Sequence, residues 1–337
     1  MALLKTSYLG MELKNPFIAG ASSLTSQRDT AKRLEDTGAA ALVTPSLFEE
    51  QIQLESFVLE EEIHRFDNLY AEMTDLFPEI KHSGPEAHLR MVADLASSLE
   101  IPVIASLNAV QPETWVHYAG LLAETGAKAL ELNFYATPTD PSRSGKDIEQ
   151  EQLAILRKIK EKVALPLSVK LSPFYTNPLH VIRSMEEAGA DGFVLFNRFF
   201  EPLIDPQKER NLIRHTLSGS NDNGITLRFT GLIGGESKGD ICASSGIMTG
   251  LDAASMILAG ASCVQVVSTL YKNPVGNMAG LIEELESWME TKGYPDLYSF
   301  RGKLSAKNNP DRWAYRRAQY VKMLMDPAGV IKTYPSN

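Results

Sequence analysis

Four segments of the chain repeat one pattern of polar and apolar positions. In each, a helical run ends at Gly-Ala and a short aliphatic strand follows. The four are EDTGAAALVTPS, AETGAKALELNF, EEAGADGFVLFN and ILAGASCVQVVS, with their glycines at Gly38, Gly126, Gly189 and Gly260. Glycine is favoured where a helix ends in a left-handed residue, and nearly continuous apolar strands are typical of a parallel sheet covered by helices. The repeat therefore predicts alternating helices and parallel strands.

Four more apolar strands fit between these repeats, at residues 15–22, 101–109, 165–173 and 239–247. The resulting eight strands, each except the last followed by a plausible helix, predict a TIM (β/α)8 barrel. This barrel would occupy the whole chain, 1–337, as a single domain. An open doubly wound sheet is the alternative that the same pattern allows.

Three stretches lie outside the repeating units. Residues 47–90 are too many for a plain connection and predict an inserted loop or lid after the second strand. The polar segment SGSNDNG at 218–224 predicts a surface loop. Residues 281–337 predict a C-terminal helical extension that packs on the barrel exterior or at a dimer contact.

The composition narrows the choice of partners. The chain has 337 residues, is 44% hydrophobic and carries a formal charge of −9. Nucleic acid and anionic membranes need clustered lysine and arginine, so a small-molecule partner is expected instead. Two cysteines, Cys242 and Cys263, do not make a disulfide framework, a CxxC zinc site or an iron–sulfur cluster, and no metal is expected. Without a signal peptide or an apolar run of about 20 residues, the chain is predicted to be soluble and cytoplasmic, with no membrane segment.

Polar side chains alternate with apolar ones in the fourth and fifth strands. Period-two alternation places Glu131, Asn133 and Lys170 on the inner side of the barrel or at its mouth, where TIM barrels carry their function. A buried lysine is costly unless an opposite charge or an anionic ligand meets it. The alternative to a functional role is a purely structural ion pair between Glu131 and Lys170 on neighbouring strands.

Small residues gather at the ends of the last two strands. Ser244, Ser245 and Gly246 close strand seven just before a helix, and Ser268 and Thr269 close strand eight. Small residues let backbone N–H groups close on a phosphate, as in the usual phosphate site of this fold, although they also cap helices for structural reasons. Together with Lys170, they indicate a ligand that has a phosphate at one end and a polarisable or anionic head at the other.

These motifs resemble the dihydroorotate dehydrogenases, which are FMN-dependent TIM barrels of pyrimidine biosynthesis. The resemblance rests on NPFIAGAS, VKLSP, FNR, SSGIMTGLDAASMILAGASCVQVVSTLY and SFRGKLS, and it extends over about residues 8–305. It is close to the soluble class of the family. It implies an oxidoreductase that converts dihydroorotate to orotate by hydride transfer to FMN.

The resemblance also implies roles for individual residues. Lys170 would face the flavin edge on which negative charge collects during reduction, and Asn133 and Asn197 would touch the flavin or the pyrimidine ring. The other residues implied to bind the cofactor are Ala19, Gly20, Ala21, Asn108, Ser245, Gly246, Ser268 and Thr269.

The sequence departs from the family on the substrate side. Pro45 replaces a lysine at the end of strand two, and Ala136 replaces the Cys or Ser that accepts a proton from dihydroorotate. Pro138 replaces a substrate-binding asparagine, and Arg198 replaces a serine and could hold a substrate carboxylate. Asn68 is the only obvious candidate for the family's substrate segment.

Alanine cannot act as a base, so the proton acceptor must be found elsewhere if the reaction is kept. Tyr135 and Thr137 are the nearest candidates, although the ordinary pKa of either hydroxyl is far above neutrality and loop packing is the simpler role. The leading hypothesis is the family enzyme with a relocated base, or a relative that acts on another small dihydro or unsaturated substrate.

Two other hypotheses stay open. One is a non-flavin barrel that binds a phosphate ligand and works as a lyase or isomerase, with Lys170 as a Schiff-base nucleophile. The other is a flavoprotein without dihydroorotate turnover. The family's usual state implies a homodimer, and the electron acceptor could be fumarate, a quinone or a nicotinamide-linked partner protein.

Overall fold

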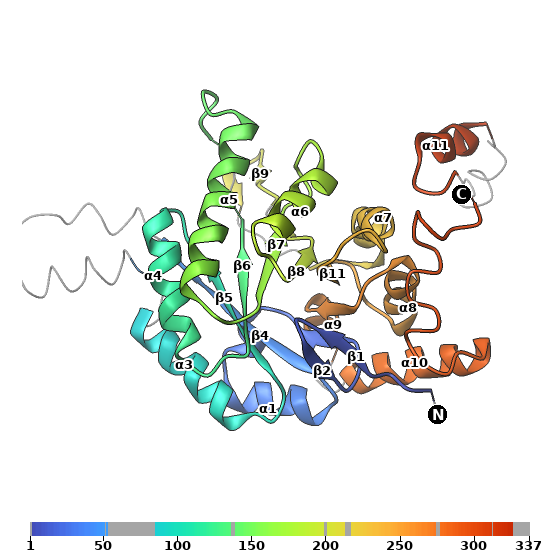
Figure 1. The fold of residues 1–337 in the computed structure, drawn as a ribbon, viewed down its shortest axis with the longest axis horizontal. Coiled ribbons are helices and arrows are strands. Elements are labelled where there is room, and N and C mark those ends of the chain that lie inside the picture. Colours follow the sequence, from blue (N-terminus) through green and yellow to red (C-terminus); the bar gives the residue numbers. More distant parts are fainter. Residues whose placement is uncertain are drawn as a thin grey trace, which may run out of the picture.

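A computed structural model of the chain describes residues 2–50, 52, 85–135, 139–198, 201–212, 217–273, 277–311 and 313–325. Its centre is a closed barrel of eight parallel strands, surrounded by helices (Figure 1). In barrel order the strands are β3 (Phe17–Ala19), β4 (Ala41–Phe48), β5 (Val103–Asn108), β6 (Ala129–Asn133), β7 (Leu167–Leu171), β8 (Gly192–Leu195), β11 (Asp240–Ser244) and β12 (Cys263–Val266). The predicted TIM barrel is thereby confirmed, and the open sheet is excluded.

The helices alternate with the strands along the chain. They are α1 (Arg28–Asp36), α3 (Pro85–Ser98), α4 (Pro112–Ala123), α5 (Gly145–Lys162), α6 (Pro178–Glu187), α7 (Gly224–Ile233), α8 (Gly250–Ala259), α9 (Ser268–Lys272) and α10 (Asn277–Lys292). The four glycines of the repeat have φ between +91° and +127°, as the helix ends require. At Gly38 a Cβ atom would also lie 2.6 Å from Ile282 Cδ1, so this turn combines a left-handed backbone with close packing.

An N-terminal hairpin that the repeat pattern does not predict closes the barrel where the strands begin. Strands β1 (Thr6–Tyr8) and β2 (Met11–Leu13) pair antiparallel, and Tyr8, Leu9 and Leu13 pack against the first inward side chains of the barrel strands. The Tyr8 hydroxyl shares a 2.7 Å hydrogen bond with Ser168 Oγ, and burial raises the pKa of the Tyr8 phenol well above its usual value.

The stretches outside the repeat differ in part from their predicted bounds. Strand β4 extends to Phe48 and α3 begins at Pro85, so both ends of the predicted 47–90 insertion belong to regular elements, and residues 53–84 lie outside the described part of the chain. In the C-terminal extension, α10 packs on α8 through Leu281 and Leu285, whereas α11 (Arg317–Leu324) has no buried residue.

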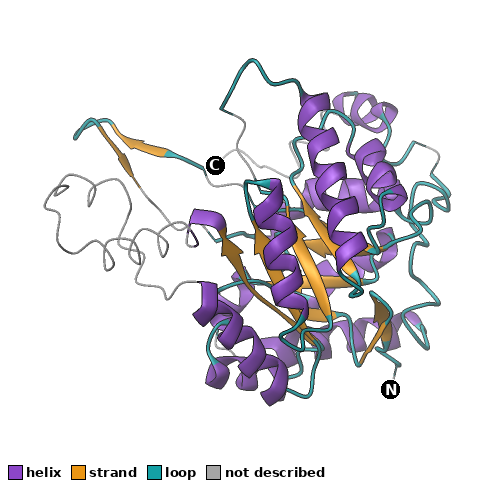
Figure 2. Ribbon diagram, turned by 60° about the vertical axis from the view of Figure 1, so that its left-hand side comes forward, coloured by secondary structure: helices purple, strands orange, loops and turns teal. Residues whose placement is uncertain are grey.

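Strands β9 (Leu203–Asp205) and β10 (Arg210–Leu212) form a second unpredicted hairpin, which projects from the barrel in Figure 2. Among the described residues, no helix is both long and apolar enough to cross a membrane.

Candidate active site

A buried polar network lies inside the upper half of the barrel. Lys170 Nζ is 3.5 Å from Glu131 Oε1 and 3.3 Å from Gln265 Oε1, and Gln265 Nε2 donates to Glu131 Oε2 at 2.5 Å. Glu131 is fully buried and Lys170 is 9% exposed. The ion pair considered as a structural alternative is therefore present, and it neutralises two charges that would each be costly alone. Gln265 was missed, because a single glutamine in an apolar strand gives no sequence signal.

Above this network, several side-chain amides are connected by hydrogen bonds. Asn197 Nδ2 donates to Asn133 Oδ1 at 2.7 Å, and Asn133 Nδ2 donates to Ser46 Oγ at 3.2 Å. Asn108 Nδ2 donates to the carbonyls of Asn133 and Tyr135 at 2.7 and 3.1 Å. The three asparagines come from the ends of different strands, and the barrel gathers them at its mouth. Strand alternation predicts this place for Asn133, whereas Asn108 and Asn197 were candidates through the family resemblance.

Ser46 can bind these amides because β4 contains a bulge. The pairing of β4 with β5 shifts between Val43 and Ser46, which leaves Thr44 and Pro45 in the irregular step. Proline has no N–H to donate, so a bulge is one of the few places where a barrel strand tolerates it. The shift turns Ser46 inward, where it also shares a 2.8 Å hydrogen bond with Ser106 Oγ.

A cavity of about 250 Å³ leads from Lys170 to the small residues at the ends of β11 and β12. Its lining includes Ala21, Lys170, Asn197, Arg198, Ser218, Ser244, Ser245, Gly246, Gln265 and Ser268. The structure thus brings most of the proposed cofactor residues around one space. Ala19 instead packs outward against the helices, and the Thr269 hydroxyl donates to the Met248 carbonyl, so neither side chain lines this cavity.

One end of the cavity needs small residues. Gly20 does not line the cavity, but a Cβ atom there would lie 2.7 Å from Cγ2 of Val267, which does. Gly246 has φ +70°, and a Cβ there would lie 2.5 Å from the backbone nitrogen of Asn223, so only glycine fits. Ser245 is also left-handed, with φ +80°, and its hydroxyl donates to the Phe196 carbonyl. This tight loop gives the cavity a narrow end lined by backbone and hydroxyl groups.

The start of α8 offers fewer N–H groups to a phosphate at the narrow end of the cavity than the small residues before this helix suggest. Asp252 Oδ2 accepts from the N–H groups of Met248 and Thr249, and Glu284 Oε2 accepts from Gly250 N at 2.7 Å. These carboxylates already satisfy the first N–H groups of the helix. Ser268, expected at the end of a strand, is instead the first residue of α9, and its Oγ accepts from Ser218 N at 2.9 Å.

The segment 217–223, which includes most of the stretch 218–224 predicted as a surface loop, closes the narrow end. Ser218 is 3% exposed and lines the cavity. Arg198 Nη1 donates to Ser218 Oγ at 2.6 Å and to Asp222 Oδ2 at 2.9 Å, and Lys272 Nζ donates to the Ser218 carbonyl at 2.7 Å. A Ser-Gly pair after the sixth barrel strand could have marked this segment, but its polar residues are equally typical of an exposed loop.

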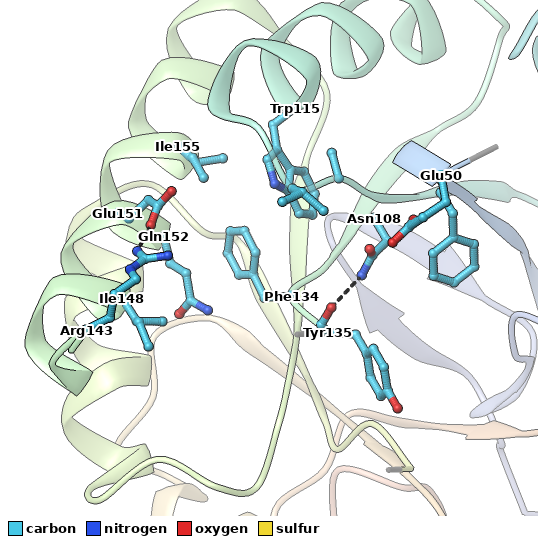
Figure 3. A pocket seen from close by; sticks show the side chains of 13 residues that line it. Glu50, Asn108, Trp115, Phe134, Tyr135, Arg143, Ile148, Glu151, Gln152 and Ile155 are labelled. Atoms are coloured by element: carbon cyan, nitrogen blue, oxygen red, sulfur yellow. Dashed lines mark hydrogen bonds and ion pairs between the residues drawn. The ribbon is translucent and has the colours of Figure 1, made fainter. Parts of the chain in front are cut away.

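A second cavity of about 680 Å³ lies beside the mouth, between α4 and α5 (Figure 3). Trp115 and Phe134 meet edge to face at 5.0 Å, and Arg143 forms an ion pair with Glu151. Tyr135 lines this cavity, but in Figure 3 its ring points away from the aromatic pair.

Four residues that the sequence singled out, Asn68, Ala136, Thr137 and Pro138, lie outside the described part of the chain. Their predicted roles stay predictions.

A closed parallel barrel with polar and charged side chains gathered at the carboxyl ends of its strands has the architecture of a TIM-barrel enzyme. Residues 66–289 match the family model described as dihydroorotate dehydrogenase, and the chain belongs to this family. The catalytic subunit of dihydroorotate dehydrogenase B (NAD(+)) from Thermoplasma volcanium is 27% identical over 90% of this chain and 98% of that protein. Dihydroorotate dehydrogenase A (fumarate) from Lactobacillus helveticus is 28% identical over 61% of this chain and 68% of that protein. The membership indicates a dehydrogenase.

Proposed function

We propose that the protein is an FMN-dependent oxidoreductase that oxidises dihydroorotate, or a closely related small dihydro substrate, in pyrimidine metabolism. The observation that carries this proposal is the 250 Å³ cavity, which has Lys170 at one end and the tight loop of Ser245 and Gly246 at the other. A ligand with a polarisable ring and a phosphate tail matches both ends.

The residues present fit FMN. The narrow end offers the hydroxyl groups of Ser245 and Ser268 and the backbone of Gly246, which are groups that can bind a phosphate. Glycine at 246 is itself required by packing, because a Cβ atom there would lie 2.5 Å from the backbone nitrogen of Asn223. Ser245, Gly246 and Ser268 would hold the phosphate, and Lys170 and Gln265 would hold the ring end. When bound, FMN supplies the hydride acceptor.

The side chains around the ring end have separate tasks. Lys170 supplies a fixed positive charge, and Glu131 and Gln265 orient its ammonium group. An ammonium group paired with a buried carboxylate is not a free amine, which weighs against Lys170 as a Schiff-base nucleophile.

Asn133 and Asn197, already linked to each other, present amide groups suited to the carbonyl and N–H groups of a dihydropyrimidine ring. Asn68 is proposed as a further substrate contact.

The proton acceptor and the partners follow from the sequence and the relatives. Tyr135 and Thr137 are proposed as candidates for the base that Ala136 cannot be. Electrons would leave to a separate acceptor, as the names of the relatives, which include NAD(+) or fumarate, indicate for those proteins. We further propose a homodimer.

An absorption spectrum of the purified protein, followed by anaerobic titration with dihydroorotate, tests this function. We expect a flavin spectrum that dihydroorotate bleaches. A yellow protein that no dihydro acid bleaches would support a flavoprotein without this turnover. A colourless protein that borohydride traps on a phosphorylated carbonyl substrate would contradict the proposal and support the lyase.

A further inference from the structure

We propose that Arg198 binds the phosphate end of the cofactor, in place of the substrate carboxylate that its position in the sequence suggests. This inference rests on the proposed function, since it assumes that the cavity holds a phosphorylated flavin. It concerns a residue at which this chain carries a guanidinium group and the family pattern carries a serine.

The side chain of Arg198 leads away from the ring end of the cavity. Its neighbour Asn197 is one of the hydrogen-bonded amides at the barrel mouth, through its bond to Asn133. Arg198 Nη1 instead reaches Ser218 Oγ and Asp222 Oδ2, at 2.6 and 2.9 Å. Both partners belong to the segment 217–223, which closes the narrow end, so the guanidinium group lies on the side where a phosphate would lie.

Ser218 ties this segment to the rest of the narrow end. Its backbone N–H donates to Ser268 Oγ, and its carbonyl accepts from Lys272 Nζ. Arg198 and Ser268 therefore contact the same residue from two sides and line the same cavity. A phosphate held by Ser268 would lie near the guanidinium group.

Two cations lie beside Ser218 at this end. Arg198 and Lys272 both contact Ser218, and Asp222 pairs with Arg198. Asp252 and Glu284 accept from N–H groups at the start of α8. A phosphate monoester carries a charge of about −1.5 to −2 at neutral pH, and Arg198 and Lys272 are the cations that could pair with it here.

The contacts of Arg198 fix its orientation and leave it able to donate further. Within the described residues, its hydrogen bonds use only Nη1, and a guanidinium group has five N–H donors in a rigid fork suited to phosphate. Asp222 is itself held by Gly219 N at 2.8 Å. To reach a carboxylate above the ring end, Arg198 would have to give up both Ser218 and Asp222.

Flavin binding to the apoprotein tests this assignment, because FMN and riboflavin differ only by the phosphate. Dissociation constants are measured by quenching of flavin fluorescence for the wild type, Arg198→Ser and Arg198→Lys, with Arg183→Ser on the exposed face of α6 as the matched control. We expect Arg198→Ser to weaken FMN binding about tenfold and to leave riboflavin binding unchanged. Arg198→Lys should recover part of the loss, and Arg183→Ser should behave as the wild type.

Three results would overturn the inference, and each points to a different cause. Equal weakening of FMN and riboflavin would give Arg198 a purely structural role. If Arg198→Ser left FMN binding unchanged and weakened the binding of orotate, measured on the flavin-loaded protein, Arg198 would instead bind the substrate. A wild-type protein that binds neither flavin would remove the proposed function, and this inference with it.

Discussion

The lower and upper halves of the barrel interior are built from the same strands and differ completely in chemistry. On β6, the inward residue changes from Ala129 to Glu131, and on β12 it changes from Cys263 to Gln265. Two residues along a strand correspond to about 7 Å. The lower half is mostly apolar, although it contains the Tyr8–Ser168 hydrogen bond, and it is closed by the N-terminal hairpin. The upper half carries an ion pair and a set of hydrogen-bonded amides.

The two halves contribute differently to the free energy of folding. The lower half stabilises the fold by burying apolar surface, whereas the upper half buries charged groups, which is costly. Burying a lysine and a carboxylate is costly unless each is paired, and a single removal leaves the other uncompensated. The closed lower half stabilises the frame that holds Lys170, Glu131 and Gln265 in register at the mouth. The following experiments test this division, from the largest expected effect to the smallest.

Removing the charged pair at the mouth should have the largest effect on chemistry. The double variant Lys170→Met with Glu131→Gln avoids a lone buried carboxylate. We expect it to fold and to slow substrate-driven bleaching of the flavin by about 10²–10³-fold, the usual effect of losing one preorganised electrostatic group. Anaerobic stopped-flow absorbance measures the rate. An unchanged rate and an unchanged reduction potential would contradict the role of Lys170.

Restoring a base should have a smaller effect in the opposite direction. Ala136→Cys is expected to raise dihydroorotate oxidation by about 10²-fold if the base is all that is missing at the mouth. Steady-state turnover with a dye as acceptor measures the gain, with Ala136→Val as the control of similar size. No gain over the control would mean that the mouth has changed its substrate as well as its base.

A change in the lower half should affect stability and leave chemistry alone. Tyr8→Phe removes the hydroxyl that shares a hydrogen bond with Ser168, and we expect the free energy of unfolding to fall by about 1–2 kcal/mol. Urea denaturation measures the loss. Bleaching of the flavin at the wild-type rate would support the separation of a stabilising lower half from a chemical upper half. A slower rate in a stably folded variant would contradict it.

Acid should loosen the mouth before the lower half. The Gly219 N–H bond, followed by the Arg198 bond, lowers the pKa of the Asp222 carboxyl below its usual value. The stability from this ion pair is thus present above the ordinary pKa of about 3.9 and is lost as pH falls through the lower, folded-state pKa. Thermal unfolding of wild type and Asp222→Asn from pH 7 to about pH 1 should show a small difference that shrinks below about pH 4 and disappears once pH falls below the lowered pKa of Asp222. A difference that stays constant across this range would assign it to packing.

The sequence predicts the barrel well because its signals are local. Gly-Ala helix ends and alternating strands recur along the chain, and the inward positions of Asn133 and Lys170 follow from period two. The two hairpins were missed because each of their strands has three residues, which is too short for a periodic pattern. The N-terminal hairpin is also stabilised by tertiary packing that the local sequence does not indicate.

The site is harder to predict because it depends on strand register and on whether the N-terminus of a helix is already capped by side chains. The bulge turns Ser46 inward, and Pro45 inside the strand is a sequence signal that could have indicated it. The first turn of α8 resembles an anion site until Asp252 and Glu284 are seen to occupy it. Arg198 shows the same limit, since its place after Asn197 suggested the substrate and its contacts lead to Ser218 and Asp222.

The bulge at Pro45 also bears on any redesign of the site. The family resemblance places a lysine at this position, and here the proline stands within a shift of register that brings Ser46 into contact with Asn133. A residue inside the irregular step does not follow the inward and outward alternation of the rest of the strand. The choice of residue at position 45 and the path of the strand are therefore a joint design problem, and Pro45→Lys alone is not expected to place an ammonium group where a regular strand would place it.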